Sequence, residues 1–181
     1  GDLGFDWLVL CTGATTAIPS QGRDVYGLEH LKAGRGPELV DQWRAQAETD
    51  RLQLSLVGGG ATGLQVLFEL HDLLRKKRID AALRLIDLGG RTLPDLPEGA
   101  HRYVVRKLRR EGIDYLSETE YRGQQDGKVQ LAESSSGREF SLPSAATLLF
   151  PGVQRAPFAI DTNSYGQVEV DGELLLNIFS A

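Results

Sequence analysis

The sequence predicts an α/β fold built on a parallel β-sheet. Apolar stretches suited to strands alternate with stretches of helical period, in the order strand, helix, strand, helix, strand. A βαβαβ unit of this kind requires parallel strands joined by right-handed crossovers. The composition agrees, because 41% of the 181 residues are hydrophobic and 25% are charged, a balance typical of folded globular proteins.

The first strand and the first helix of this unit flank a run of glycines. Residues 52–57 read Leu-Gln-Leu-Ser-Leu-Val, which is typical of a buried strand. A triple glycine at 58–60 ends the strand, and apolar side chains recur at helical spacing over 61–77. The basic run at 75–78 then places cations at the negative end of the helix dipole. We interpret it as helix-end charge rather than as a nucleic-acid site.

The second half of the unit is shorter. Residues 83–87 are the next predicted strand, and Pro97-Glu98 begin a helix that reaches about Glu111. Residues 113–116 are the third strand. The unit therefore ends as it began, with an apolar segment that a parallel sheet can bury.

A meander and one more buried strand follow the unit. Two turn signals, Asp126-Gly127 and Ser134-Ser135-Ser136-Gly137, separate three short strand candidates. The candidates are residues 121–125, 128–132 and 138–142. A last apolar strand at 147–150 ends at Pro151-Gly152. We therefore expect a three-stranded β-meander in place of another crossover helix.

Charge and composition exclude several classes of function. Twenty basic and 25 acidic residues give a formal charge of −5, which argues against nucleic acid as a partner. No apolar run approaches the roughly 18 residues of a membrane helix. Three histidines and Cys11, the single cysteine, do not make a metal site or an internal disulfide. We expect no metal and a reducing, cytoplasmic compartment.

The glycine run matches a nucleotide-binding motif. Gly58-Gly59-Gly60-Ala61-Thr62-Gly63 fits G-x-G-x-x-G between a predicted strand and a predicted helix. Gly58 would allow the tight turn, Gly60 would admit a pyrophosphate, and Gly63 would let the helix pack on the strand. The free N–H groups near Ala61 and Thr62 would face the anion. The motif predicts a Rossmann-like dinucleotide site, and a turn that binds nothing is the alternative.

Two neighbouring positions test this interpretation. Leu64 and Gln65 stand where a nucleoside-triphosphate loop needs Lys and then Ser or Thr, so that class is excluded. Asp87 ends the second predicted strand, where an acid accepts hydrogen bonds from the adenosine ribose. Its carboxylate would repel a 2′-phosphate and so favours NAD(H), although Arg91 could weaken that preference. A solvated strand-end carboxylate is the alternative for Asp87.

Several segments in order resemble one family. Leu8-Val9-Leu10-Cys11-Thr12-Gly13-Ala14 is similar to a segment that lies beside the flavin in the pyridine nucleotide-disulfide oxidoreductases, a family of two-dinucleotide flavoproteins. The strongest likeness is to the type II NADH dehydrogenase-like branch. The other matching segments are 57–63, 85–87, 91–94 and 149–153.

The resemblance implies a domain organisation and a partner set. Residues 31–155 would be the NAD(H)-binding domain, and 1–30 and 156–181 would be strips of an FAD domain whose remainder lies outside the chain. Thr12 and Gly13 would face FAD, while Gly152 and Gln65 would lie on the nicotinamide side. The absence of methionine and the apolar segments at both ends agree with a piece of a longer protein.

The implied activity is hydride transfer from NADH to FAD, with electrons passed on to a quinone or another acceptor. The chain alone is expected to be inactive, and the full-length protein is expected at the cytoplasmic face of a membrane. Many relatives have glutamate where this chain has Gln65, a neutral amide that cannot move a proton, so no catalytic acid, base or nucleophile is assigned. The alternatives are a non-catalytic dinucleotide sensor and a site for S-adenosylmethionine.

Overall fold

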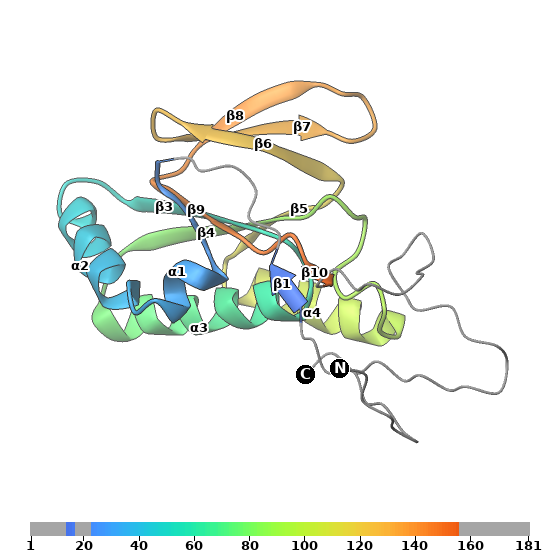
Figure 1. Ribbon diagram of the computed structural model, residues 1–181, viewed down its shortest axis with the longest axis horizontal. Coiled ribbons are helices and arrows are strands. Elements are labelled where there is room, and N and C mark those ends of the chain that lie inside the picture. The colour runs from blue at the N-terminus through green and yellow to red at the C-terminus, as the bar shows by residue number, and fades with distance from the viewer. Residues whose placement is uncertain (1–13, 17–22, 156–181) are drawn as a thin grey trace, which may run out of the picture. The chain divides into compact units, whose positions relative to one another are not determined.

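The computed structural model describes residues 14–16 and 23–155 of the chain (Figure 1). The chain divides into two compact units, residues 1–17 with 153–181, and residues 18–152. In the first unit the described residues form an antiparallel pair of strands, β1 (Ala14–Thr16) and β10 (Val153–Arg155). The expected flavin-facing residues Thr12 and Gly13 lie outside the described residues, as does Cys11. The expected domain bounds stay a prediction.

The second unit is built on a five-stranded parallel sheet with the order β2-β9-β3-β4-β5. Every neighbouring pair of these strands is parallel. The strands are β2 (Val25–Gly27), β3 (Leu52–Val57), β4 (Ala81–Ile86), β5 (Asp114–Leu116) and β9 (Ala146–Leu149). Because β3, β4 and β5 are adjacent in chain order, the predicted βαβαβ unit with its parallel sheet is confirmed.

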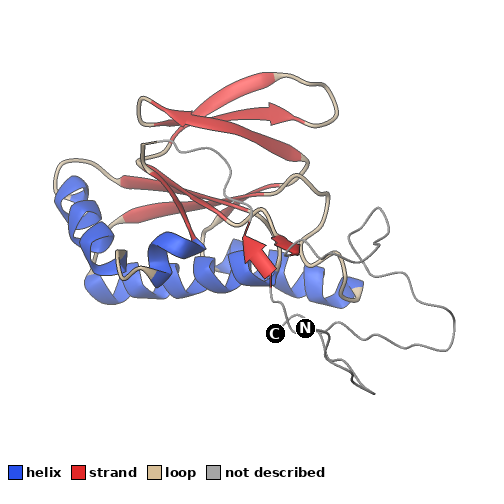
Figure 2. Cartoon of the chain, viewed as in Figure 1, coloured by secondary structure: helices blue, strands red, loops and turns tan. Residues whose placement is uncertain are grey.

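The helices α3 (Ala61–Lys77) and α4 (Glu98–Arg110) make the two crossovers of this unit. Both lie along the same face of the sheet (Figures 1 and 2). Their apolar positions Leu67 and Leu108 are buried in one core with Leu54 and Leu85 of the sheet. This core explains why apolar residues recur at helical spacing in the sequence, because each helix buries one apolar stripe in it.

The opposite face of the sheet is covered by a three-stranded antiparallel sheet, β6 (Thr119–Gln125), β7 (Lys128–Glu133) and β8 (Glu139–Pro143). Asp126 and Gly127 join β6 to β7 with φ of 50° and 70°, the left-handed conformations that a tight hairpin turn needs. Val129 and Leu131 of β7 pack with Ile86 of β4. The predicted meander is therefore confirmed, and the unit has three layers: helices, parallel sheet and meander.

The layer between the parallel sheet and the meander is partly polar. The buried Arg84 guanidinium donates to the Ser55 hydroxyl at 3.4 Å and to the Pro143 carbonyl at 3.3 Å. Burial lowers the pKa of Arg84. Nearby, the Thr147 hydroxyl donates to Oε1 of Gln124 at 2.7 Å. Directional hydrogen bonds therefore add to the small apolar cluster that holds the meander on the sheet.

Three elements of the second unit were not predicted from the sequence, namely β2, α1 (Leu28–Lys32) and α2 (Gly36–Ala47), and neither were β1 and β10 of the first unit. The helix α2 buries only Leu39, Val40 and Trp43, which is too short a stripe to stand out as a pattern. The strand β4 ends at Ile86, so Asp87 belongs to the connection that follows rather than to the strand. Among residues 14–16 and 23–155, no helix has both the length and the apolar character to cross a membrane.

Candidate functional site

The glycine motif forms the connection between β3 and α3 at the carboxyl ends of the parallel strands. Gly58 has a φ of 110°, and a Cβ placed on it would lie 2.2 Å from the Phe150 carbonyl oxygen. A Cβ placed on Gly63 would lie 2.2 Å from the Gly58 carbonyl oxygen. Real Cβ atoms do not approach other atoms so closely, so both positions require glycine. The turn therefore packs tightly against β9 on one side and α3 on the other.

The amino end of α3 is open. Gly60 is the N-cap residue, and a Cβ placed on it would meet nothing within 4 Å. The first internal bond of this turn runs from the Leu64 N–H to the Gly60 carbonyl at 3.0 Å. The N–H groups before Leu64 have no partner within the helix, and Ala61 and Thr62 are exposed. This end of α3 can therefore receive an anion, aided by the helix dipole.

Asp87 lies against the glycine turn. A Cβ placed on Gly59 would lie 1.9 Å from Oδ2 of Asp87, so the carboxylate occupies the space that a side chain would need. The Gly89 N–H donates to Oδ1 of Asp87 at 3.3 Å. Burial raises the pKa of Asp87, while the backbone amides of Gly89, Gly59 and Leu88 act in the opposite direction. The structure thus brings Asp87 and the motif together, and it gives Gly59 a role that the motif alone does not specify.

The connection that follows Asp87 is fastened to the same turn. The Leu93 N–H donates to the Gly59 carbonyl at 3.0 Å, and Thr92 is fully buried. The Thr92 N–H donates to Nδ1 of His101 on α4 at 3.1 Å, and the Thr92 hydroxyl lies 3.2 Å from the same nitrogen. The sequence analysis did not identify His101 as a site residue. Its position near the start of the predicted helix is the one sequence signal for it, and nothing in a single sequence connects that histidine with Thr92.

The other predicted site residues occupy different surroundings. The Arg91 guanidinium donates to the Leu96 carbonyl, and its Nε is buried without a hydrogen-bond partner among the described residues. Gly152 is exposed with a φ of 104° and comes shortly after Phe150, whose carbonyl abuts Gly58. Gln65 is exposed on α3. Their contacts with a cofactor stay a prediction.

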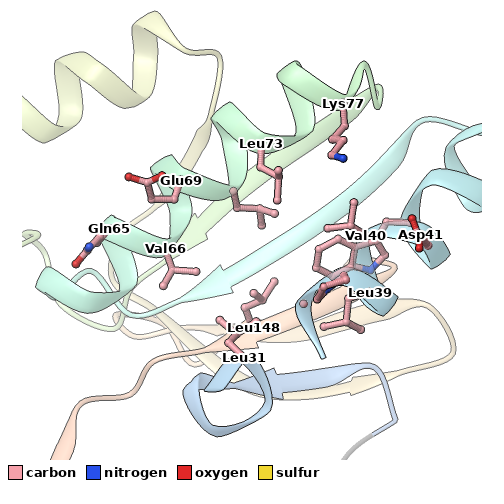
Figure 3. Close-up of a pocket in the computed structure, with 14 residues that line it drawn as sticks. Leu31, Leu39, Val40, Asp41, Gln65, Val66, Glu69, Leu73, Lys77 and Leu148 are labelled. Carbon is pink, nitrogen blue, oxygen red and sulfur yellow. The ribbon is translucent and has the colours of Figure 1, made fainter. Parts of the chain in front are cut away.

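A groove of about 780 Å³ lies beside α3, between this helix and α1 and α2 (Figure 3). Its walls are mostly apolar and include Val40, Val66 and Leu73. Among the described residues that line it, Gln65 is the single one that was predicted as a site residue. The groove is therefore a feature beside the glycine turn rather than the turn's own cavity.

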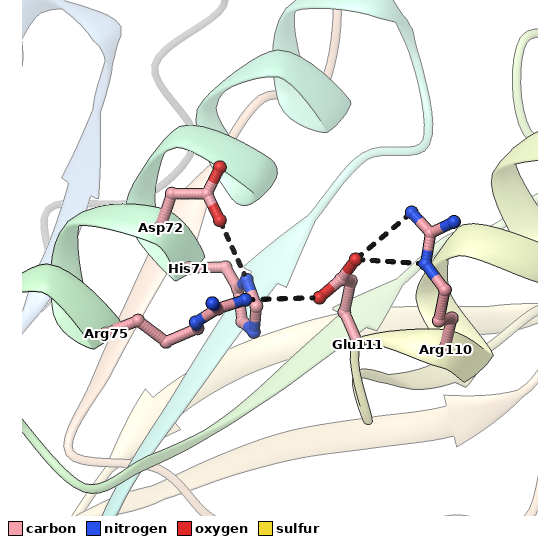
Figure 4. A network of polar contacts seen from close by, with 5 residues as sticks. All are labelled: His71, Asp72, Arg75, Arg110 and Glu111. Atoms are coloured by element: carbon pink, nitrogen blue, oxygen red, sulfur yellow. Dashed lines mark hydrogen bonds and ion pairs between the residues drawn. The ribbon is translucent and has the colours of Figure 1, made fainter.

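The far end of α3 carries a polar network instead of a site (Figure 4). Glu111, just after α4, forms an ion pair with Arg75 at 3.6 Å and accepts a hydrogen bond from Arg110 at 3.2 Å. His71, whose side chain is 15% exposed, has Nδ1 3.4 Å from Oδ1 of Asp72. The basic run at the end of α3 thus includes an ion pair to the neighbouring helix, and its position at the helix's carboxyl end suits the dipole.

A parallel sheet in which a glycine turn leads from a central strand into a helix, with an acid directly after the next strand, defines a Rossmann-type domain. Residues 1–179 match the model of the family described as "Pyridine nucleotide-disulphide oxidoreductase". The chain belongs to this family.

Individual relatives agree with this assignment. The chain is 26% identical, over 98% of its length, to demethylphylloquinone reductase NdbB of Synechocystis sp., and spans 46% of that protein. It is 26% identical, over 88% of its length, to the mitochondrial external alternative NAD(P)H-ubiquinone oxidoreductase B1 of Arabidopsis thaliana, and spans 32% of it. The chain thus spans less than half the length of these relatives.

Solved structures share the fold. NDH2 from Plasmodium falciparum, solved in complex with NADH, superposes with a TM-score of 0.67 at 17% identity, covering 80% of this chain and 34% of that one. An NAD-dependent persulfide reductase from A. fulgidus gives a TM-score of 0.58 at 24% identity, covering 84% of this chain and 27% of that one. These likenesses show a shared fold. The family model and the curated relatives relate the chain to NAD(P)H and quinone oxidoreductases.

Proposed function

We propose that this chain is the NAD(H)-binding part of an FAD-dependent oxidoreductase, in which a hydride from NADH reduces the flavin and electrons pass on to a quinone or another acceptor. The observation that carries the proposal is the open amino end of α3 beside a turn that only glycine can form. Family membership and the names of the relatives support the redox role.

The described residues fit a dinucleotide at this edge of the sheet. The amides near Ala61 and Thr62 would hold the diphosphate, and the missing side chain of Gly60 would leave room for it. Asp87, fixed beside Gly59, would accept hydrogen bonds from the adenosine ribose. Gln65 and Gly152 would lie on the nicotinamide side. FAD would be held outside the described residues, with Thr12 and Gly13 facing it.

The part of this chain in the chemistry is binding and orientation. Bound NADH supplies a hydride, so the domain needs no nucleophile of its own. Gln65 has an amide that donates and accepts hydrogen bonds but does not move a proton at neutral pH. The proposal places the protein in the cytoplasm, with the full-length form at the cytoplasmic face of a membrane.

Calorimetry with NADH tests the binding step on the 181-residue chain. Gly60→Val should weaken NADH binding by about a hundredfold, roughly 2.7 kcal/mol, because the new side chain fills the space in front of the first turn. Gly99→Val is the matched control, since a Cβ on Gly99 also meets nothing within 4 Å but lies at the start of α4. Equal affinity of wild type and Gly60→Val, or equal losses in both variants, would contradict the assignment.

A non-catalytic sensor is the second candidate, and Gln65 is the observation that favours it. The two functions separate when the full-length protein with bound FAD is mixed with NADH under anaerobic conditions and without a quinone. Bleaching of the flavin absorbance by NADH supports the oxidoreductase. Tight NADH binding with an unchanged flavin spectrum supports the sensor.

A further inference from the structure

Glu118 occupies a corner where its backbone is fixed. It lies between β5 and β6 with a φ of 49°, a left-handed conformation that residues other than glycine rarely adopt. Its N–H donates to the Gly89 carbonyl at 3.1 Å, and its carbonyl accepts from the Ser134 N–H at 2.8 Å. The next amide, that of Thr119, donates to the Asp87 carbonyl at 2.9 Å. The corner is thereby tied to the connection that begins at Asp87.

The Glu118 side chain lies over that same connection. A Cβ placed on Gly90 would lie 3.8 Å from Cγ and 3.9 Å from Oε1 of Glu118. Glu118 is exposed, so its carboxylate faces solvent beside Gly90. The fixed backbone therefore keeps the carboxylate beside the connection that begins at Asp87.

The Tyr115 hydroxyl lies within the electrostatic reach of both Glu118 and Asp87. Burial raises the pKa of the Tyr115 hydroxyl to about 12, and the charges of Asp87 and then Glu118 act in the same direction. Both carboxylates are therefore close enough to one hydroxyl group to influence it. The cation of this connection, Arg91, is held by its bond to the Leu96 carbonyl. That carbonyl is neutral and leaves the charge of Arg91 in place, so the two carboxylates Asp87 and Glu118 exceed this cation by one negative charge.

We infer that Glu118 is a second specificity-determining carboxylate, which acts with Asp87 to exclude a dinucleotide that carries a 2′-phosphate. The inference rests on the proposed function, since it assumes that the adenosine ribose lies at Asp87. A 2′-phosphate at that ribose would add up to two negative charges next to Gly89 and Gly90. Asp87 would bond the ribose of NADH, whereas Glu118 would act by repulsion at a distance and would leave NADH binding unaffected.

The test measures NADH and NADPH affinities of the 181-residue chain by calorimetry. Glu118→Gln should tighten NADPH binding by about tenfold and change NADH binding by less than about twofold. Glu118→Gly removes the charge together with the left-handed strain and should give the same change in preference. Glu139→Gln, an exposed glutamate at the start of β8, is the control for net charge and should change neither affinity.

Ionic strength separates repulsion from a contact effect. The Debye length falls from about 10 Å at 0.1 M salt to about 3 Å at 1 M, so the gain in NADPH affinity should shrink as salt rises. An unchanged NADPH affinity in both Glu118 variants overturns the inference about Glu118. If the wild type still binds NADH in that case, the proposed function stands. Failure of the wild type to bind either dinucleotide overturns both.

Discussion

The two strand-to-helix connections at the carboxyl edge of the sheet are built differently. The first, from β3 to α3, is the glycine turn at 58–60, and it offers backbone amides and open space. The second, from β4 to α4, spans 87–97 and presents the side chains of Asp87 and Arg91, while the buried Thr92 holds it to α4. Backbone amides suit a diphosphate that all dinucleotides share, whereas side chains can distinguish one ribose from another.

The two connections are also fastened together, which the sequence does not show. Asp87 fills the space beside Gly59, and Leu93 donates to the Gly59 carbonyl at 3.0 Å. The comparison therefore shows that the connection suited to a particular ribose contacts Gly59 of the turn suited to a diphosphate. Variants on either side should separate their contributions to stability and to binding.

The largest expected effect comes from the first connection. Gly63→Ala places a Cβ 2.2 Å from the Gly58 carbonyl, so α3 must move away from the turn. We expect a loss of about 3 kcal/mol or more in the free energy of unfolding, measured by urea denaturation. Gly99→Ala is the control: it adds the same methyl group to α4 in open space and should stabilise by up to about 1 kcal/mol. Equal effects of the two changes would refute the packing argument.

A middle-sized effect is expected in the second connection. His101→Leu removes the acceptor of the buried Thr92 N–H and should cost about 1–3 kcal/mol of unfolding free energy. Thr92→Val keeps that N–H bond and removes only the hydroxyl, so it should cost less. Amide hydrogen exchange gives a local readout, because the Thr92 amide should lose protection in His101→Leu. Undiminished protection would show that His101 does not hold this connection.

The smallest effect at neutral pH is expected beneath the second connection, at Tyr115. Its hydroxyl oxygen is buried without a hydrogen-bond partner among the described residues, so Tyr115→Phe should be neutral or stabilise by up to about 1 kcal/mol. The pKa of about 12 in the folded protein exceeds the ordinary value of 10.0, so the unfolded chain loses this proton first. Above pH 10, wild-type stability should therefore fall more steeply than that of the variant.

Unfolding curves at pH 7 and at several values from about pH 9 to 11.5 check this prediction. Because lysines titrate in the same range, the informative quantity is the difference between the two proteins rather than either curve alone. A constant difference across this range would show that Tyr115 ionises as readily in the folded protein as in the unfolded chain.

The sequence was sufficient to predict the helices and strands that bury a regular stripe of apolar side chains. The bounds of β3 and α3 agree with the prediction. The apolar pattern changes from strand-like over 52–57 to helical over 61–77, and the triple glycine marks the boundary between them. The pattern could not reveal β2, since its three residues gain their stability by pairing with β9, far along the chain. The helix α2 was missed for a related reason, because its buried face depends on where the sheet lies.

The candidate site could likewise be predicted in part from the sequence. The motif at 58–63 and the acid Asp87 follow a known spacing, so sequence alone could place them near each other. The contacts of Thr92 with His101, and of Glu118 with Gly90, join residues from separate elements. No local pattern encodes such contacts, because they depend on the path of two loops over the sheet.

The polar layer at Arg84 has a consequence for how this fold can vary. Arg84 and Ser55 both belong to the parallel sheet, so of these two bonds the one from Arg84 to the Pro143 carbonyl of β8 joins the two sheets and favours one alignment of them. The outer strands of the meander can then accept new surface side chains while the corner that presents Glu118 keeps its place. On the proposal above, a lineage shifts its coenzyme preference by changing one exposed residue, without rebuilding the scaffold below it, while Asp87 keeps its own part in excluding a 2′-phosphate.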